Sequence, residues 1–104
     1  MGTVTSAYDG NYRFTGYSWA PSMGQNPVSG TFSVHNGYVS DSTGNFTGYI
    51  YDGGSSGGVF TGTLKNSGAS VLPLNATGNF YRDGSAVIKI GDSRVGMDLS
   101  GKKL

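Results

Sequence analysis

Dipeptides that favour tight turns recur along this chain about one strand length apart. They are Asp9-Gly10, Asn36-Gly37, Asp52-Gly53, Ser67-Gly68, Asp83-Gly84 and Gly91-Asp92. Asn-Gly and Asp-Gly supply the positive φ angles that short hairpin turns require. Short strands joined by such turns are typical of an antiparallel barrel or sandwich. The spacing therefore predicts an all-β protein built of consecutive hairpins.

Alternating apolar and polar residues between these turns predict eight or nine short strands. We expect them near residues 11–19, 28–35, 38–43, 45–51, 58–65, 69–74, 76–82, 86–90 and 93–99. The segment 20–26, with Pro21 and Pro27, is expected to be the longest loop.

Composition supports this fold class. The chain has 104 residues, 19 of them glycine, and it contains no glutamate and few other strong helix formers. Its length fits one domain over residues 1–104 with a modest core. We interpret residues 1–2 and 103–104 as vector-derived ends.

Two segments with the motif Phe-Thr-Gly specify a register. Pairing their apolar residues sets Phe46 against Leu64, Ile50 against Phe60, and a glycine against a glycine at the centre. Facing glycines allow a sheet to bend sharply. Because other strands repeat this pattern, we expect a small, Gly-rich antiparallel barrel with a filled interior, a sandwich being the alternative.

A second register follows from the turn at Asp83-Gly84. A three-residue loop over 83–85 predicts that Phe80 lies opposite Ile88 on the core side. Phenylalanine then points inward and tyrosine outward along most strands, although alternation leaves the direction of Tyr12 and Tyr38 open.

The predicted outer face carries an unusual share of aromatic side chains. Exposed Tyr and Trp offer rigid contact area at low entropic cost, as binding interfaces do. Cross-strand pairs of such residues also stabilise small sheets, which is the alternative interpretation. The candidate binding residues are Tyr17, Trp19, Tyr49, Tyr51 and Tyr81.

The residues needed for catalysis are sparse. The chain has no cysteine, no glutamate and one histidine, His35, beside the Asn36-Gly37 turn. Three aspartates precede glycines and fit turns, while Asp41 and Asp98 have no evident partner. We therefore expect no enzyme activity, no catalytic residues, no cofactor and no metal site. Haem or metal ligation by His35 remains a third alternative for the function.

Charge and hydropathy limit the classes of partner that we expect this chain to bind. The net charge is +1, and the basic residues are scattered except for Lys102-Lys103. This pattern predicts no nucleic-acid binding. The sequence has no apolar stretch of membrane-spanning length, so we expect no membrane insertion. Low charge with abundant Gly, Ser, Thr, Asn and Tyr is typical of extracellular or bacterial cell-surface proteins.

Four short motifs resemble a known family. Gly-Asn-Phe-Thr-Gly at 44–48, Gly-Val-Phe-Thr-Gly at 58–62, Thr-Gly-Asn-Phe-Tyr at 77–81 and Leu-Ser-Gly-Lys-Lys at 99–103 follow one another as in the small β-barrels of transferrin-binding-protein-like surface lipoproteins. The resemblance covers roughly residues 30–103. It implies a bacterial surface barrel that acts as a binding or supporting module.

The sequence thus predicts a non-enzymatic extracellular domain that binds a protein or glycan through exposed Tyr and Trp side chains. The alternative is a structural subunit that self-associates, such as an adhesin repeat, a matrix protein or a virion decoration.

Overall fold

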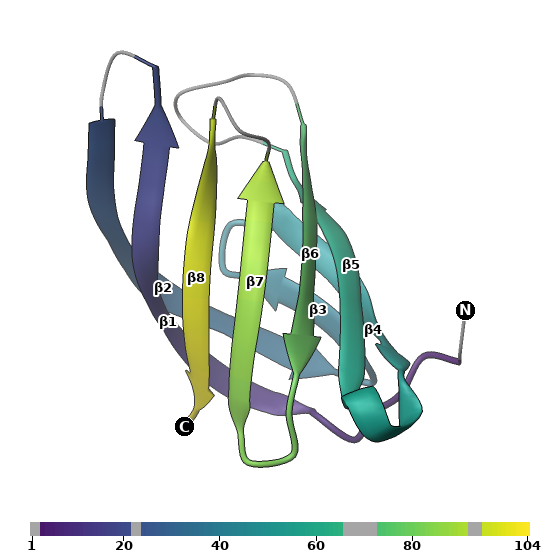
Figure 1. Cartoon of the computed structure of the whole chain (residues 1–104). Coiled ribbons are helices and arrows are strands. Elements are labelled where there is room, and N and C mark those ends of the chain that lie inside the picture. Colours follow the sequence, from purple (N-terminus) through teal and green to yellow (C-terminus); the bar gives the residue numbers. More distant parts are fainter. Residues whose placement is uncertain (1–2, 22–23, 66–72, 92–94) are drawn as a thin grey trace.

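The computed structural model describes residues 3–21, 24–65, 73–91 and 95–104. It contains eight strands and one short 3-10 helix (Figure 1). In chain order they are β1 (Gly10–Ala20), β2 (Gly24–His35), β3 (Tyr38–Asp41), β4 (Phe46–Asp52), η1 (Gly54–Ser56), β5 (Gly58–Leu64), β6 (Leu74–Phe80), β7 (Ser85–Gly91) and β8 (Gly96–Lys103).

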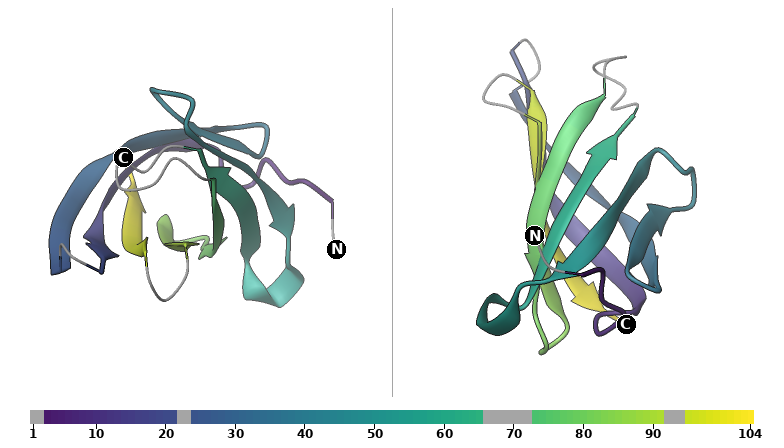
Figure 2. Two further views of the ribbon diagram at one scale, coloured as in Figure 1. Left: turned by 90° about the horizontal axis from the view of Figure 1, so that it is seen from above. Right: turned by 90° about the vertical axis from the view of Figure 1, so that its right-hand side faces the viewer.

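Each strand pairs antiparallel with the next, and β8 pairs with β1, which closes the barrel. The predicted all-β barrel of consecutive hairpins is therefore confirmed. Figure 2 shows from above that the β1–β2 side (purple and blue) lies opposite the β4–β5 side (teal).

The stagger of the strands sets the width of the barrel. A row of paired residues that starts at Pro27 on β2 passes through β1, β8, β7, β6, β5, β4 and β3, and returns to β2 at His35. The row has shifted by eight residues, so eight strands combine with a shear of eight. The same values describe (β/α)8 barrels, whose interior is filled by side chains. Among the described residues, aromatic and aliphatic side chains fill this narrow interior.

The β4–β5 register is confirmed. Phe46 pairs with Leu64, Ile50 with Phe60, and Gly48 with Gly62. A Cβ atom built on Gly62 would overlap the carbonyl oxygen of Thr47, and one on Gly48 would lie 2.5 Å from the Thr61 oxygen. The two glycines are needed because the backbones approach too closely here for any side chain.

The interior is a cluster of aromatic rings surrounded by aliphatic side chains. Phe80 is fully buried, and its ring centroid lies 5.2 Å from that of Tyr12, 6.0 Å from Phe32 and 6.1 Å from Phe60. Tyr12 is 1% exposed and points inward, whereas Tyr38 is 39% exposed and points outward. This settles the two directions that alternation left open.

Residues 3–9 precede the barrel and cover one of its ends. Val4 forms a bridge with Tyr51, and the Thr5 amide donates to the carbonyl of Ile50 (2.9 Å). Tyr8 is 5% exposed and accepts a hydrogen bond on its carbonyl from the Tyr12 hydroxyl (2.7 Å). The turn expected at Asp9-Gly10 lies slightly earlier, since the Asp9 amide closes it on the carbonyl of Ser6 (3.1 Å).

The prediction of a loop over residues 20–26 is wrong. β1 continues to Ala20 and β2 begins at Gly24, with Trp19 opposite Gln25 and Tyr17 opposite Pro27. A proline is compatible with this strand because its missing N–H can face away from β1.

The strand expected at 69–74 falls mostly outside the described residues, and Leu74 begins β6 instead. Most of the strand expected at 93–99 is found as the start of β8, although residues 93–94 lie outside the described part.

The β6–β7 register is shifted by two residues from the prediction. Phe80 lies opposite Ala86, and Ile88 lies opposite Gly78. The three-residue loop consists of residues 82–84, because the Tyr81 amide donates to the Ser85 carbonyl (2.9 Å) and Gly84 takes the positive φ of 93°. Since a shift of two preserves alternation, both side chains still face the core.

Candidate functional site

The structure divides the five predicted binding residues among separate regions. Tyr17 and Trp19 lie on β1, and Tyr49 and Tyr51 lie on β4. Since β2 and β3 lie between these strands, the two pairs occupy different sides of the barrel (Figure 2). Tyr81 follows β6 and lines a small hollow with the η1 turn. The five side chains therefore do not form one continuous face.

The tyrosine pair on β4 has a partner that the sequence analysis missed. Tyr38 on β3 lies opposite Tyr49, and their ring centroids are 5.1 Å apart with the planes inclined by 58°. Tyr51 is partly covered through its bridge to Val4. This pair could have been predicted from the Asn36-Gly37 dipeptide, because a two-residue turn there makes Tyr38 the first residue of β3.

Trp19 lies over a glycine rather than standing free. It is opposite Gly96, where a built Cβ atom would come within 3.1 Å of the indole ring. Its partial burial gives it a packing role on β8. Among the five predicted binding residues, Tyr17 has the largest exposed fraction, 55%.

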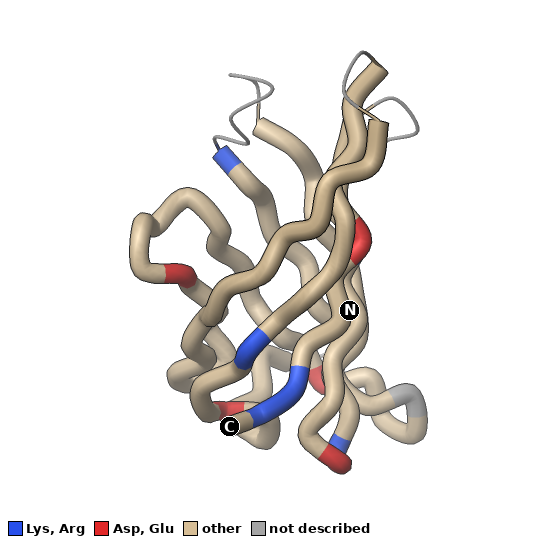
Figure 3. The backbone as a smooth tube through the Cα atoms, turned by 90° about the vertical axis from the view of Figure 1, so that its left-hand side faces the viewer, with Lys and Arg blue, Asp and Glu red and all other residues tan. Residues whose placement is uncertain are grey.

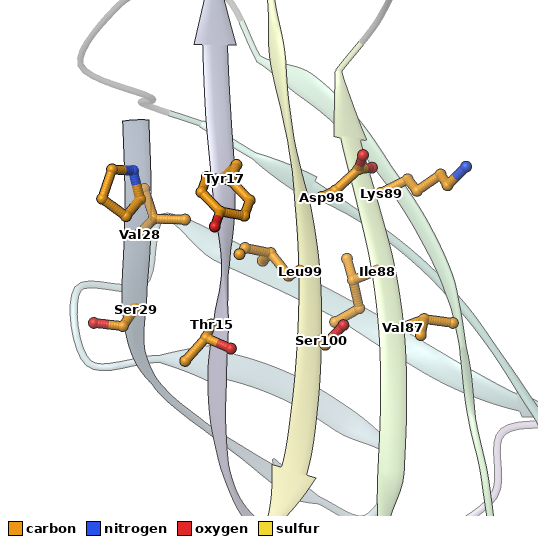
Figure 4. Close-up of a pocket in the computed structure, with 12 residues that line it drawn as sticks. Thr15, Tyr17, Val28, Ser29, Val87, Ile88, Lys89, Asp98, Leu99 and Ser100 are labelled. Carbon is orange, nitrogen blue, oxygen red and sulfur yellow. The ribbon is translucent and has the colours of Figure 1, made fainter. Parts of the chain in front are cut away.

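Tyr17 borders a groove on the outer surface of β2, β1, β8 and β7, with a volume of about 720 Å³. Figure 4 shows outward side chains at two levels, and Val28, Leu99 and Ile88 of the row between them also line the groove. One level holds Tyr17, Asp98 and Lys89, and the other holds the members of a second cross-strand row, which are Ser29, Thr15, Ser100 and Val87. The groove therefore combines one aromatic ring, two charged groups, three Ser or Thr hydroxyls and several aliphatic side chains.

The two charged groups in the groove, on Asp98 and Lys89, do not bind each other. Asp98 is the central member of the row, with Tyr17 opposite on one side and Lys89 on the other. Figure 4 shows the Lys89 amine extending away from the Asp98 carboxylate. Within the described part of the chain, the two groups form no ion pair and Asp98 accepts no hydrogen bond.

The other described aspartates hold turns together. Asp9 accepts from the amides of Asn36 and Gly37, and Asp41, which had no evident partner in the sequence, accepts from Thr43 and Gly44. Asp52 and Asp83 accept from the amides of Gly54 and Ser85, respectively. Asp98 is thus the described aspartate whose oxygens stay available to a ligand.

Asp83, in the turn between β6 and β7, accepts two hydrogen bonds from Ser85. The Ser85 hydroxyl donates to Asp83 (2.6 Å), as does the Ser85 amide (2.9 Å). These bonds, aided by the charge of Lys102, lower the pKa of Asp83 below its ordinary value. The effect belongs to the β6–β7 turn and not to the groove.

His35 lies exposed at the end of β2, with a ring nitrogen 3.3 Å from the Asn36 side-chain nitrogen. No group of three or more His, Cys, Asp or Glu side chains suited to a metal ion occurs among the described residues.

Basic residues gather near the C-terminal end of β8. Arg13 on β1 lies directly opposite Lys102, and Lys103 follows (Figure 3). Like charges facing each other across strands are mildly destabilising. The sequence showed only the Lys102-Lys103 pair, because Arg13 is brought beside it by the closure of the barrel.

The comparisons with protein-family models, curated proteins and solved structures give no match for this chain. In the described part of the chain, no helix has the length and apolar character needed to cross a membrane.

Proposed function

We propose that this chain is a non-enzymatic extracellular binding domain that recognises a glycan through the outer groove of β2, β1, β8 and β7. The observation that carries the proposal is the exposed ring of Tyr17 opposite the exposed Asp98, whose carboxylate accepts no hydrogen bond from the described residues. The side chains that fill the described interior favour a site on the outer surface.

The groove offers the contacts that a sugar ring needs. A pyranose presents an apolar C–H face, which can stack on the ring of Tyr17, and hydroxyls along its edge. A carboxylate such as that of Asp98 accepts hydrogen bonds on two oxygens, and the Lys89 ammonium donates. The hydroxyls of Thr15 and Ser100 can do either.

A glycan fits this groove better than a large protein interface does. Binding sites for small polar ligands are concave and combine apolar area with a few oriented polar groups. Protein interfaces instead concentrate several large anchors at a desolvated centre. Here Tyr17 is the aromatic side chain that lines the groove, beside hydroxyl, charged and aliphatic side chains.

The test is binding of the purified chain to a panel of immobilised neutral and acidic oligosaccharides, followed by titration calorimetry with those retained. Tyr17→Ala and Asp98→Asn should each weaken binding at least tenfold. Tyr49→Ala is the matched control, because Tyr49 is a similarly exposed tyrosine (46%) on the other side of the barrel. Each folded variant is first checked by circular dichroism.

Retained binding in Tyr17→Ala together with lost binding in Tyr49→Ala would move the site to the Tyr38–Tyr49 pair. If all three variants bind an oligosaccharide like the wild type, the proposed groove is wrong.

A further inference from the structure

Two basic side chains face each other on the outer surface of β1 and β8. Arg13 and Lys102, here called the basic pair, are directly opposite in the β1–β8 register, and both are exposed. Figure 3 shows the basic segments of the two strands (blue) next to each other. Thr15 and Ser100, which line the groove, form the next outward pair on the same strands. The basic pair therefore continues the surface of the groove.

The register brings the two cations close enough to bind one anion. The Leu104 amide donates to the Asn11 carbonyl (2.8 Å), which marks these two residues as a hydrogen-bonded pair. Arg13 and Lys102 are two residues away on their respective strands, so they form a pair of the same kind, with Cα atoms about 5.5 Å apart. Because directly opposed residues point to the same face of a sheet, both charged groups project from the outer surface.

The basic pair has no counterion within the described part of the chain. Arg13 and Lys102 form no ion pair or side-chain hydrogen bond with the residues described there. Asp83 interacts with the charge of Lys102 over a longer distance, but its carboxylate accepts the amide and hydroxyl of Ser85. Like charges opposite each other cost stability, and an anion between them would replace this repulsion by two attractions.

Three kinds of side chain follow one another along this surface. Figure 4 shows the side chains of Thr15 and Ser100 below that of Tyr17, and the basic pair lies two residues further along the same strands. Tyr17 and Arg13 are four residues apart on β1, which corresponds to about 13 Å along an extended strand. An aromatic ring, two hydroxyls and two cations are thus arranged over the length of a short oligosaccharide.

We propose that the basic pair is an anion subsite of the groove, so that the chain binds acidic glycans in preference to neutral ones. A carboxylate or sulfate group of the glycan occupies the subsite, while another sugar of the same chain stacks on Tyr17. Arg13 supplies a planar fork that matches two oxygens of the anion, and Lys102 adds a point charge. This inference rests on the glycan function proposed for the groove.

The negative charge of Asp98 is compatible with an acidic glycan. Asp98 lies four residues from Lys102 on β8, about 13 Å along the strand. This distance exceeds the Debye length of about 8 Å at physiological ionic strength. Repulsion between Asp98 and an anion at the basic pair is therefore largely screened, and Asp98 still accepts hydrogen bonds from sugar hydroxyls.

A glycan suits this surface better than a nucleic acid does. Nucleic acids bind along rows of cations, where each neutralised phosphate adds to the affinity. Here the outward side chains between the basic pair and Tyr17 are the hydroxyls of Thr15 and Ser100, which both donate and accept hydrogen bonds. A single anion subsite beside uncharged hydroxyls fits a sugar chain in which acidic groups are separated by neutral ones.

Titration calorimetry tests the subsite with oligosaccharides of alternating uronic acid and hexosamine. The probes are an unsulfated form, a sulfated form, and a form whose acidic carboxyls have been reduced to alcohols. The wild type should bind an acidic form at least tenfold more tightly than the reduced form. Arg13→Gln and Lys102→Gln should each remove most of this preference, while their affinity for the reduced form stays unchanged. The difference between the two acidic forms shows whether a carboxylate or a sulfate occupies the subsite.

Lys65→Gln is the matched control, because Lys65 is an exposed cation that follows β5, outside the groove, and its loss changes the net charge equally. This variant should bind all the oligosaccharides like the wild type. Arg13→Gln and Lys102→Gln should unfold at the same urea concentration as the wild type or a higher one, since they remove a repulsion. Lost binding in these variants then reports the subsite and not the fold.

The same measurements separate this inference from the glycan function itself. If Arg13→Gln and Lys102→Gln bind the acidic forms like the wild type and Tyr17→Ala does not, the subsite is wrong and the groove stands. If Tyr17→Ala keeps the acidic binding that the other two variants lose, the basic pair binds anions without the groove, and both proposals are wrong.

Two further results would overturn the subsite. One is a wild type that binds none of the oligosaccharides, or that binds the reduced form as tightly as the acidic ones. The other is a single-stranded DNA of matched charge that binds as tightly as the acidic oligosaccharides, which would show that the basic pair recognises charge alone.

Discussion

The carboxylate of Asp9 holds the turn at Gly37, although 28 residues separate them in the sequence. One oxygen accepts the Gly37 amide (3.0 Å), and the other accepts the neighbouring Asn36 amide (2.7 Å). The segment that covers one end of the barrel is thereby fastened to the hairpin that joins β2 and β3. Turn stability and closure of this end are therefore coupled.

Asp9→Ala should lower the free energy of unfolding by about 2–4 kcal/mol, because it removes two hydrogen bonds to a charged acceptor and leaves two amides to find water. Urea denaturation measures this loss. Asp52→Ala is the control, since Asp52 accepts from the single exposed amide of Gly54 (2.9 Å), and it should cost about 1 kcal/mol or less. Equal losses in the two variants would show that Asp9 does not fasten the end of the barrel.

The paired glycines of β4 and β5 predict a strong asymmetry between two alanine substitutions. Gly62→Ala should destabilise the protein by about 3 kcal/mol or more, because the new methyl group meets backbone atoms that cannot move aside. Gly101→Ala is the matched control on β8. Its Cβ atom would lie no closer than 3.6 Å to any neighbour, so its effect should stay below about 1 kcal/mol. Thermal and urea unfolding of the two variants compare them, and a reversed order would contradict the close approach.

The packing of the aromatic interior predicts that truncating Phe80 lowers the free energy of unfolding more than truncating Phe14 does. Phe80 is fully buried and contacts four aromatic rings, whereas Phe14 is partly buried and contacts Phe32 alone, with centroids 6.0 Å apart. Phe80→Leu should therefore cost about 1–3 kcal/mol, and Phe80→Ala about 3–5 kcal/mol. Phe14→Ala should cost clearly less. Near-ultraviolet circular dichroism would follow the loss of ring packing, and a Phe14→Ala variant less stable than Phe80→Ala would refute this ranking.

Local patterns were sufficient to predict the barrel. Alternation identified Phe46, Ile50 and Phe60 as core residues, and the facing glycines selected their register. The β6–β7 register failed because it depended on which residue of the 82–85 turn adopts a positive φ. That choice is made by Asp83, whose side chain binds Ser85 and leaves Gly84 as the bent residue.

The candidate groove could not be predicted in the same way. Alternation placed Tyr17 and Tyr49 on the outer face, but the outer face of a barrel points in all directions. Only the order of the strands shows that Tyr17 shares its side with Asp98 and Lys89. Because β1 and β8 are far apart in sequence, no local pattern reports this contact.

Tyr12 gives the barrel a dependence on alkaline pH. Burial, assisted by the charge of Asp9 and by the neighbouring Tyr8, raises the pKa of Tyr12 from 10.0 to about 12. The folded state therefore favours the protonated phenol, which donates to the Tyr8 carbonyl (2.7 Å). This stabilisation is fully present below pH 10 and is lost as the pH rises through 12. Raising the pKa of Tyr12 from 10.0 to about 12 contributes about 3 kcal/mol to the free energy of unfolding below pH 10.

Urea denaturation at a series of pH values between 8 and 12 measures this loss. Tyr12→Phe should be less stable than the wild type at pH 8 by about 1–3 kcal/mol, because the Tyr8 carbonyl loses its buried donor. Its stability should then fall less steeply between pH 10 and 12, so that the gap between the two proteins narrows. The difference in tyrosinate absorbance between wild type and variant reports the titration of Tyr12 itself. Two stability curves that fall in parallel over this interval would show that the Tyr12 proton is not linked to folding.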